Sequence, residues 1–427
     1  MISVQLLIVS FLGISLLASI ISRKTKTPYT ILLVVVGIIL SATSDPALSS
    51  VGDLFKDLLN GGLFVGLILP PLLFDSMMNI KVDDFRAVSR PALVLATAGV
   101  VVATIVGGLI FWLVLGLPPY SAFLFSALIA PTDVATVLEI FKRTMVPSKL
   151  ATLVELESAF NDATGIVVFT LFLTSVEAPS QVLVSGLSAL ITTFGGGAAI
   201  GLFVAWGARQ LQRETSDPVS QTVLTLTAVY GAYGLAVSAG VSGLIAVAVA
   251  GLFYGDTLLF HMKGQDTERV TREFWNILAF IANTAAFLYV GFSATISGLA
   301  GNALAILVAY GVVVFARLVA VYPILSMKQI AGPRFPWSWK NVTMLGGMRG
   351  ALAIALVSTL GTTLPADQFS LLVNLTFGVA LVSILVQGPI LTRYATRSFG
   401  RQQLLDEVPK TEPEPTPPAD ASATASS

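Results

Sequence analysis

The chain has 427 residues, of which 55% are hydrophobic and only 11% are charged, and its mean hydropathy is +0.85. Soluble proteins carry about 25% charged residues, so this composition excludes an ordinary soluble protein. Basic and acidic residues balance at 24 each, which leaves no basic excess for a nucleic-acid partner. With no cysteines and a single histidine, His261, the chain offers no disulfide and no Cys or multi-His metal site, and we expect no cofactor.

Apolar runs of about 20 residues recur along the whole length, and each is long enough to cross a bilayer. They predict an all-α polytopic membrane protein with about thirteen spans, and residues 48–60 are expected to form a short interfacial helix. Basic residues follow the first run instead of preceding it, which favours a spanning helix over a signal peptide. The spans are expected at 3–22, 28–43, 61–79, 91–116, 119–141, 149–176, 181–208, 219–237, 240–256, 272–297, 302–327, 340–361 and 366–392.

Residues 1–401 are expected to form one transmembrane domain. From 402 to 427 the chain is rich in Pro, Ser, Ala and acidic residues, which predicts a disordered cytoplasmic tail. We expect no soluble catalytic domain, and therefore not an enzyme.

Lysine and arginine concentrate in alternate loops, which predicts the orientation. With the N-terminus outside, the inner loops and the segment after the last span hold 20 of the 24 basic residues. The outer loops hold only Lys56, and Lys410 lies in the tail. The pattern predicts an odd number of spans in a plasma or inner membrane, with the C-terminus in the cytoplasm. The inner basic residues are Arg23, Lys24, Lys26, Lys81, Arg86, Arg90, Lys142, Arg143, Lys149, Arg209, Arg213, Lys263, Arg269, Arg272, Lys328, Arg334, Lys340, Arg393, Arg397 and Arg401.

An odd span count also suggests two related halves, spans 1–6 and 8–13, which would have inverted topology. Span five contains "ALIAPTDVATV" and its counterpart, span twelve, contains "LGGMRGALAIAL". Proline and glycine interrupt these two spans in matching positions. Such a pair indicates a substrate site near mid-membrane.

Charged residues inside spans are costly and point to function. Asp162 and Ser158 are four residues apart and share a helix face, and such hard oxygen ligands suit a monovalent cation. Asp133 follows a proline-disturbed turn and is a second candidate, although it can instead simply cap the next half-helix. The candidates for function among the charged residues of the spans are Asp75, Asp133, Glu139, Glu155, Glu157, Asp162, Arg317 and Arg349.

The other buried charges have other expected roles. Glu157 is the expected partner of Arg317, because an unpaired buried charge is strongly unfavourable. Arg349 is expected to offset the negative charge of the site or to line an inner funnel. Glu155 and Glu139 are expected to be solvated or funnel residues. Asp75 is either a third ligand or a polar lining residue.

The motifs "LPPLLFD", "APTD", "ESAFND", "FARLVAVYP" and "GGMRGALAIAL" occur in this order from span three to span twelve. Together they resemble those of the NhaP/NHE-type monovalent cation/proton antiporters. The resemblance implies about thirteen spans, inverted repeats, two crossing interrupted helices (spans 5 and 12) and a homodimer.

The resemblance also implies residue roles. Asp162 matches the essential ion- and proton-binding aspartate, and Asp133 matches its partner carboxylate. Thr132 and Ser158 match oxygen donors, and Asp75 matches an acidic ligand position, which gives Na⁺ five expected ligands. Asn161 matches the asparagine of members that exchange one cation for one proton, and Glu157 with Arg317 matches a stabilising ion bridge. The segment "NDATGIVV" departs from the commoner forms after the aspartate, which leaves the preferred cation open.

The expected function is therefore electroneutral Na⁺/H⁺ antiport by alternating access, in which proton and cation compete for Asp162 and Asp133. Two alternatives stay open: a K⁺-selective or electrogenic antiporter, and, from a different class, a cation channel or a membrane receptor without transport.

Overall fold

The computed structural model describes residues 4–25, 27–42, 63–174, 182–214, 217–255, 265–293, 296–331 and 335–406. Within these ranges the chain is helical and contains no β-strand. The interfacial helix expected at 48–60 and His261 lie outside the described residues. So does most of the expected tail, since the last helix runs past residue 401 to Asp406 and residues 407–427 are not described.

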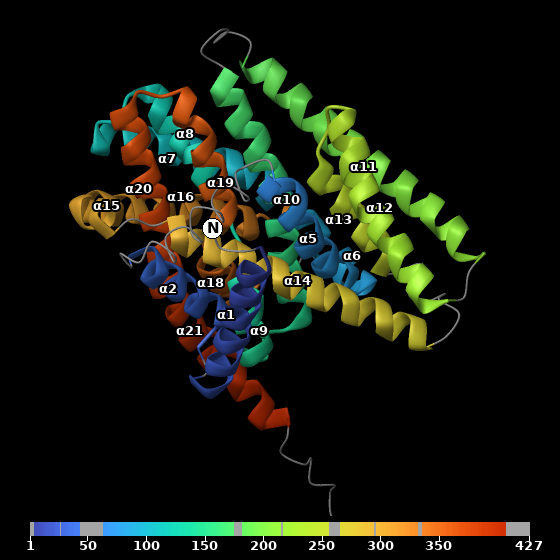
Figure 1. Cartoon of the computed structure of the whole chain (residues 1–427). Helices are drawn as coiled ribbons and strands as arrows, with labels where there is room; N and C mark the ends of the chain where they lie inside the picture. Colours follow the sequence, from blue (N-terminus) through green and yellow to red (C-terminus); the bar gives the residue numbers. More distant parts are fainter. Residues whose placement is uncertain are drawn as a thin grey trace, which may run out of the picture.

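Figure 1 shows the arrangement of the described helices. Their bounds are α1 (Val4–Thr25), α2 (Tyr29–Ala42), η1 (Phe64–Ile68), α5 (Leu69–Met78), α6 (Val82–Val94), η2 (Leu95–Gly99), α7 (Val100–Leu115), α8 (Pro119–Ile129), α9 (Ala135–Thr144), α10 (Ser148–Thr174), α11 (Val182–Gln212), α12 (Pro218–Ser238), α13 (Gly243–Phe253), α14 (Gln265–Ser293), α15 (Ile296–Gly301), α16 (Ala303–Ser326), α17 (Lys328–Ala331), α18 (Trp337–Leu345), α19 (Ala351–Ser358), η6 (Thr359–Thr362), α20 (Ala366–Val382), η7 (Ser383–Gln387) and α21 (Gly388–Asp406).

Among the described helices, seven are long and apolar enough to cross a membrane, and several shorter apolar helices lie between them. Large apolar side chains such as Leu12, Leu113 and Phe203 are exposed on the outside of the molecule. Such a surface suits lipid and not water. The chain is therefore a helical membrane protein.

Three of these helices are continuous through wide π-helical turns. η1 leads into α5, η2 joins α6 to α7, and η7 joins α20 to α21. Pro70 and Pro71 follow η1, and Pro389 follows η7. A proline supplies no backbone N–H to the preceding turn, which favours a locally widened helix. The spans predicted at 91–116 and 366–392 are consequently parts of longer helices, Val82–Leu115 and Ala366–Asp406.

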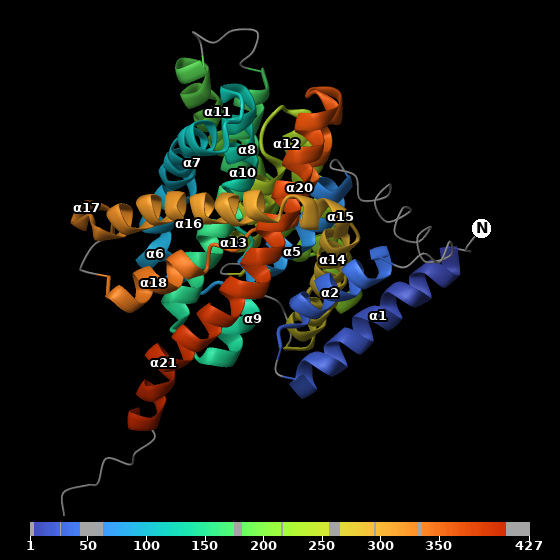
Figure 2. The ribbon, with the colours of Figure 1, turned by 90° about the vertical axis from the view of Figure 1, so that its left-hand side faces the viewer.

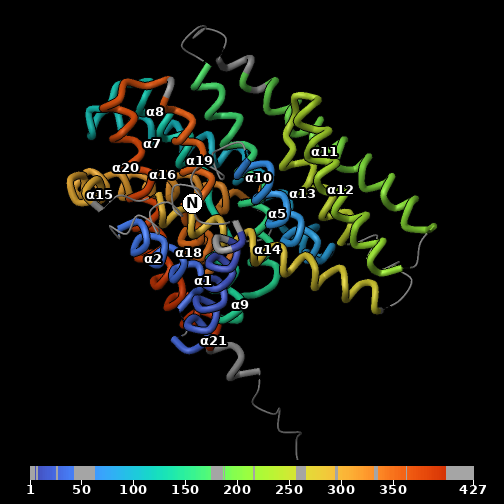
Figure 3. The backbone as a smooth tube through the Cα atoms, viewed as in Figure 1, coloured from blue at the N-terminus to red at the C-terminus, as the bar shows by residue number. Residues whose placement is uncertain are grey.

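The helices pack into two groups. In the first, which we call the scaffold group, α2 packs on α14, α5 on α13 and α14, and α12 on α13 and α14, with α1 against α2. In the second, which we call the site group, α7 packs on α8 and α16, α10 on α6 and α8, α16 on α20, α19 on α20, and α9 on α21. Figure 2 shows α1 at one edge of the molecule and α21 leading away from its base. The backbone trace in Figure 3 shows α14 running from the side of α12 into the centre.

Small residues allow the closest helix contacts. Gly37 of α2 faces Gly291 of α14, and a Cβ on either glycine would meet the backbone of the other helix. Gly165 of α10 similarly makes room for the ring of Pro131. Association of helices in membranes depends on such close backbone approach, because burial of apolar side chains from lipid gains little.

Candidate functional site

The helix predicted at 119–141 is broken. α8 ends at Ile129, residues 130–134 are not helical, and α9 begins at Ala135. Pro131 lies in the break and cannot donate a backbone hydrogen bond, so the carbonyl groups that end α8 lack helical partners.

The helix predicted at 340–361 is broken at the corresponding place. α18 ends at Leu345, and Gly350 precedes α19 in an extended conformation (φ −128°, ψ −160°). The two breaks touch, because the N–H of Asp133 donates to the carbonyl of Met348 at 2.8 Å. The sequence motifs thus meet in space although they are more than 200 residues apart.

Asp133 lies where the two half-helices begin. Its Oδ1 accepts a hydrogen bond from the N–H of Ala135, the first residue of α9, at 2.8 Å. On the other side the carboxylate lies against Gly350, where a Cβ would collide with it. The positive ends of α9 and α19 therefore both face this carboxylate and favour its negative form. Asp133 thus caps α9, which was the alternative role predicted from the sequence. The capping bond uses only Oδ1 of the carboxylate.

The residues of α10 divide between two faces. Glu155, Ser158 and Asp162, spaced i, i+3 and i+7, line one cavity. Glu157 and Asn161 point the other way and are almost completely buried, with 1% and 0% of their surface exposed. The acidic residues of this helix thus have two different environments.

Thr132 is held by both faces of α10. The hydroxyl of Ser158 donates to the carbonyl of Thr132 at 2.6 Å. The amide of Asn161 accepts from the N–H of Thr132 at 3.3 Å and donates to its hydroxyl at 2.8 Å. Asn161 also donates to Glu157 Oε1 at 3.0 Å. Asn161 thus holds the break between α8 and α9 against α10, and it is not among the residues that line the cavity.

Glu157 and Arg317 form a bidentate ion pair. The guanidinium of Arg317 donates to both carboxylate oxygens at 2.9 and 2.8 Å, and to the carbonyl of Thr343 at 3.0 Å. Gly347 makes this possible, since a Cβ at that position would overlap the guanidinium. The pair joins α10, α16 and α18 inside the site group.

Arg349 lies behind the site and not in a funnel. Only 2% of its surface is exposed, and it is not among the residues that line the cavity. Its guanidinium donates to the carbonyls of Ala130 and Pro131 and so neutralises the negative end of α8. Its own N–H donates to the hydroxyl of Ser383 at 3.0 Å, in the wide turn η7.

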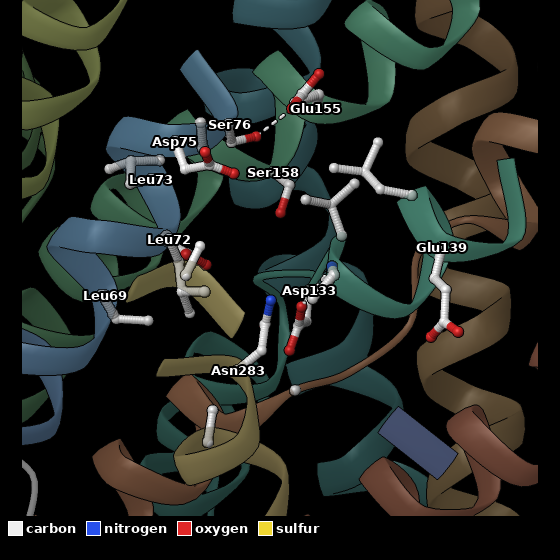
Figure 4. A pocket seen from close by; sticks show the side chains of 18 of the residues that line it. Leu69, Leu72, Leu73, Asp75, Ser76, Asp133, Glu139, Glu155, Ser158 and Asn283 are labelled. Atoms are coloured by element: carbon white, nitrogen blue, oxygen red, sulfur yellow. Dashed lines mark hydrogen bonds between the residues drawn. The ribbon is translucent and has the colours of Figure 1, made fainter. Parts of the chain in front are cut away.

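The cavity has a volume of about 760 Å³ and lies between the two groups of helices. The predicted ligands Asp75, Thr132, Asp133, Ser158 and Asp162 all line it. In Figure 4, Asp75 and Ser158 lie on facing walls and Asp133 points toward Asn283. Within the described ranges no three carboxylate, His or Cys side chains are placed to hold a metal ion. Asp75, Asp133 and Asp162 therefore do not form a preassembled three-carboxylate cage.

Three further polar groups lie on the cavity wall. The sequence predicted no partner for two of them, Glu155 and Glu139, and did not indicate the third, Asn283. Glu155 accepts a hydrogen bond from the hydroxyl of Ser76, the neighbour of Asp75. Glu139 accepts from the N–H of Tyr29. Asn283 presents a side-chain oxygen that has no hydrogen-bond partner within the protein. The spacing of Glu155 from Ser158 and Asp162 was a readable signal for its position, whereas nothing in the sequence joins Asn283 to the site.

This arrangement, a helical membrane protein in which two broken helices meet beside half-buried carboxylates, defines a class of ion transporters. Comparison with known proteins identifies the family. The sequence profile described as "Sodium/hydrogen exchanger, transmembrane" matches residues 11–397, and the chain belongs to this family.

Among its relatives, the Na⁺/H⁺ antiporter ApNhaP of Aphanothece halophytica is 31% identical over 383 residues, which cover 88% of this chain and 71% of ApNhaP. The Na⁺/H⁺ antiporter NhaP of Pseudomonas aeruginosa is 32% identical over 349 residues, which cover 79% of this chain and 81% of that protein. The solved structure of the sodium proton antiporter MjNhaP1 of Methanocaldococcus jannaschii at pH 8 superposes with a TM-score of 0.73 at 24% identity. That superposition covers 93% of this chain and 99% of MjNhaP1, so the two proteins share their fold.

Proposed function

We propose that this protein is a secondary active Na⁺/H⁺ antiporter that exchanges one Na⁺ for one proton by alternating access. Membership of the exchanger family and the antiporter activity named for several relatives support the exchanged ions. The observation that carries the proposal is the placement of Asp133 and Asp162 on one cavity, next to two facing helix breaks.

In the proposed cycle, Asp162 and Asp133 hold either a proton or a cation. A carboxylate cannot stay charged and unpaired while it crosses a low-dielectric barrier. The site therefore changes sides either protonated or with Na⁺ bound, and this requirement couples the two fluxes. Ser158 and the carbonyl of Thr132 supply neutral oxygens to the cation, and Asp75 supplies a further oxygen when the cavity narrows around it.

The proposed stoichiometry rests on the small number of titrating groups. Asn161 stands where a second carboxylate would add another proton, so one charge moves each way. The proposal also includes thirteen spans in two inverted repeats, an external N-terminus and a plasma or inner membrane location. The homodimer stays a prediction, and the mass of the protein in detergent or nanodiscs tests it.

The experiment is cation-driven proton movement in proteoliposomes, measured with Li⁺, Na⁺ and K⁺ over a range of pH and with a membrane-potential probe. We expect Na⁺-driven proton efflux without a change of potential, and its loss in Asp162→Asn and Asp133→Asn. Full exchange in either variant would refute the site. A preference for K⁺, or a potential change, would favour the K⁺-selective or electrogenic alternative. Uncoupled flux, or no flux, would favour a channel or a receptor.

A further inference from the structure

Two carboxylates on the cavity wall, Glu139 and Glu155, have no part in the proposed ion site. Both belong to the site group, Glu139 on α9 and Glu155 on α10. Each hydrogen-bonds to a residue of the scaffold group. The two carboxylates lie at different edges of the same cavity (Figure 4). This shared placement calls for a common explanation.

Glu139 is the more extensively bonded of the two. Both of its carboxylate oxygens lie 3.0 Å from the N–H of Tyr29, the first residue of α2. The carboxylate therefore caps the positive end of a helix in the other group. Arg143, one turn along α9, holds the same carboxylate at 2.7 Å, and 16% of the Glu139 side chain is exposed.

The contact between α9 and the scaffold group extends beyond Glu139. The hydroxyls of Thr136, about one turn before Glu139 in α9, and Thr30 are 3.0 Å apart. Arg143 also donates to the hydroxyl of Ser22 at the end of α1, at 2.9 Å. α9 begins two residues after Asp133, so any movement of this contact is passed directly to the ion site.

Glu155 makes the matching contact on the other edge. Its carboxylate accepts from the hydroxyl of Ser76 on α5, and Ser76 follows Asp75 in the chain. Together the two contacts tie α9 to α2 and α10 to α5, and the cavity lies between them.

We propose that Glu139 and Glu155 are latches that hold the two groups of helices in the conformation open toward Lys142, Asn79 and Asn276. These three residues are exposed and line the mouth of the cavity. Opening the opposite side requires the site group to move against the scaffold group, and that movement breaks both contacts. The latches therefore set the fraction of molecules whose cavity is open on this side. The inference rests on the proposed function only for alternating access and not for the identity of the ions.

The absence of native cysteines allows a direct test. Leu72→Cys places a reporter on the cavity wall, on the scaffold group, at a half-buried position (Figure 4). Its alkylation by a membrane-impermeant maleimide, added on the side of Lys142, reports how often the cavity is open there. Glu139→Ala in this background is expected to slow alkylation by roughly three- to tenfold, because loss of a charge-assisted bond shifts a two-state equilibrium by about that factor.

Two variants separate the latch from a general structural effect. Glu139→Gln keeps an amide oxygen that can accept from Tyr29, so its alkylation rate is expected between those of Glu139→Ala and the parent. Asp266→Ala breaks an exposed ion pair with Arg269 inside α14, within one group, and is expected to leave the rate unchanged. The Michaelis constant for Na⁺ on the same side should rise in Glu139→Ala by the factor by which the open fraction falls.

An unchanged alkylation rate in a folded Glu139→Ala protein would overturn the proposal, as would an equal effect of Asp266→Ala. Alkylation does not require exchange. If the parent protein exchanges no cations but Glu139→Ala still slows alkylation, the latch stands and the proposed function fails.

Discussion

Asp133 has a structural role in the helix break and, in the proposed mechanism, a second role in ion binding. One of its oxygens caps α9, and the carboxylate also faces the start of α19 across Gly350. An amide at this position can still cap α9, but it cannot bind a proton or balance a cation. Asp133→Asn should therefore retain the fold while losing exchange, which separates the two roles in a single variant.

We expect the ion pair of Glu157 and Arg317 to contribute to stability more than to transport. Glu157→Gln leaves Arg317 buried without a counter-charge, and breaking such a pair costs about 3–5 kcal/mol. We expect a clearly lower melting temperature in detergent for Glu157→Gln. Glu157→Leu combined with Arg317→Met should recover much of the loss, because it removes both charges. Normal stability of Glu157→Gln would contradict this role.

The hydrogen bonds of Asn161 lead to a prediction beyond its proposed role in stoichiometry. Its amide donates to both Glu157 and Thr132. A carboxylate there would face the carboxylate of Glu157 and lose the bond to it. Asn161→Asp is therefore expected to lower thermal stability and to slow exchange, instead of simply adding a transported proton. A stable, fast and electrogenic Asn161→Asp protein would contradict this expectation.

The sequence anticipates much of this residue chemistry, including the pairing of Glu157 with Arg317, but not the partners of Glu155 and Glu139. The spacing of residues along α10 separates Glu155, Ser158 and Asp162 from Glu157 and Asn161 by helix geometry alone. The partners of Glu155 and Glu139 depend on how α5 and α2 pack against the site group. Packing of this kind follows from the whole fold, and no local pattern encodes it.

At the scale of elements, the two helix breaks form one unit. The guanidinium of Arg349 donates to the carbonyl of Pro131 after the end of α8, and the backbone N–H of Asp133 donates to the carbonyl of Met348. The hydroxyl of Ser383 accepts from the N–H of Arg349. Gln387, also in η7, donates to the carbonyl of Leu345 at the end of α18. The wide turn η7 thus supplies partners to backbone groups that the break leaves free. The prolines and glycines predict where the helices break, whereas the support from η7 is visible only in three dimensions.

Gly350 is the tightest point of this unit. A methyl group there would collide with the carboxylate of Asp133. Gly350→Ala should cost about 1–3 kcal/mol of stability and, by displacing Asp133, lower the exchange rate by about tenfold or more. Gly311→Ala on α16, where a Cβ meets nothing within 4 Å, is the matched control and should leave both unchanged or slightly improved. Equal behaviour of the two variants would show that the contact with Asp133 is unimportant.

At the scale of the whole molecule, the distribution of charge predicts the orientation, and single cysteines can test this prediction. Arg213, after α11, belongs to the basic side, and Thr363, before α20, lies on the side with few basic residues. Arg213→Cys should react with an impermeant maleimide only from the cytoplasm, and Thr363→Cys only from outside. Reaction of both from one side would contradict the predicted topology.

The division of the helices into two groups could not be predicted from the sequence. Hydropathy and charge predict a helical membrane protein, and the structure confirms this fold class. They do not show that the helices pack into two groups, or that the cavity lies between them. That division arises from contacts such as Gly37 with Gly291 on α2 and α14, which are far apart in the chain.

Competition between proton and cation for Asp162 and Asp133 is the central claim, and the pH dependence of the Michaelis constant for Na⁺ tests it most directly. The measurement is Na⁺-driven proton movement in proteoliposomes at a series of pH values, with the potential clamped. If both ions use one site, the Michaelis constant for Na⁺ should rise as the pH falls while saturating Na⁺ restores the full rate. A maximal rate that falls with pH at a constant Michaelis constant would contradict a shared site.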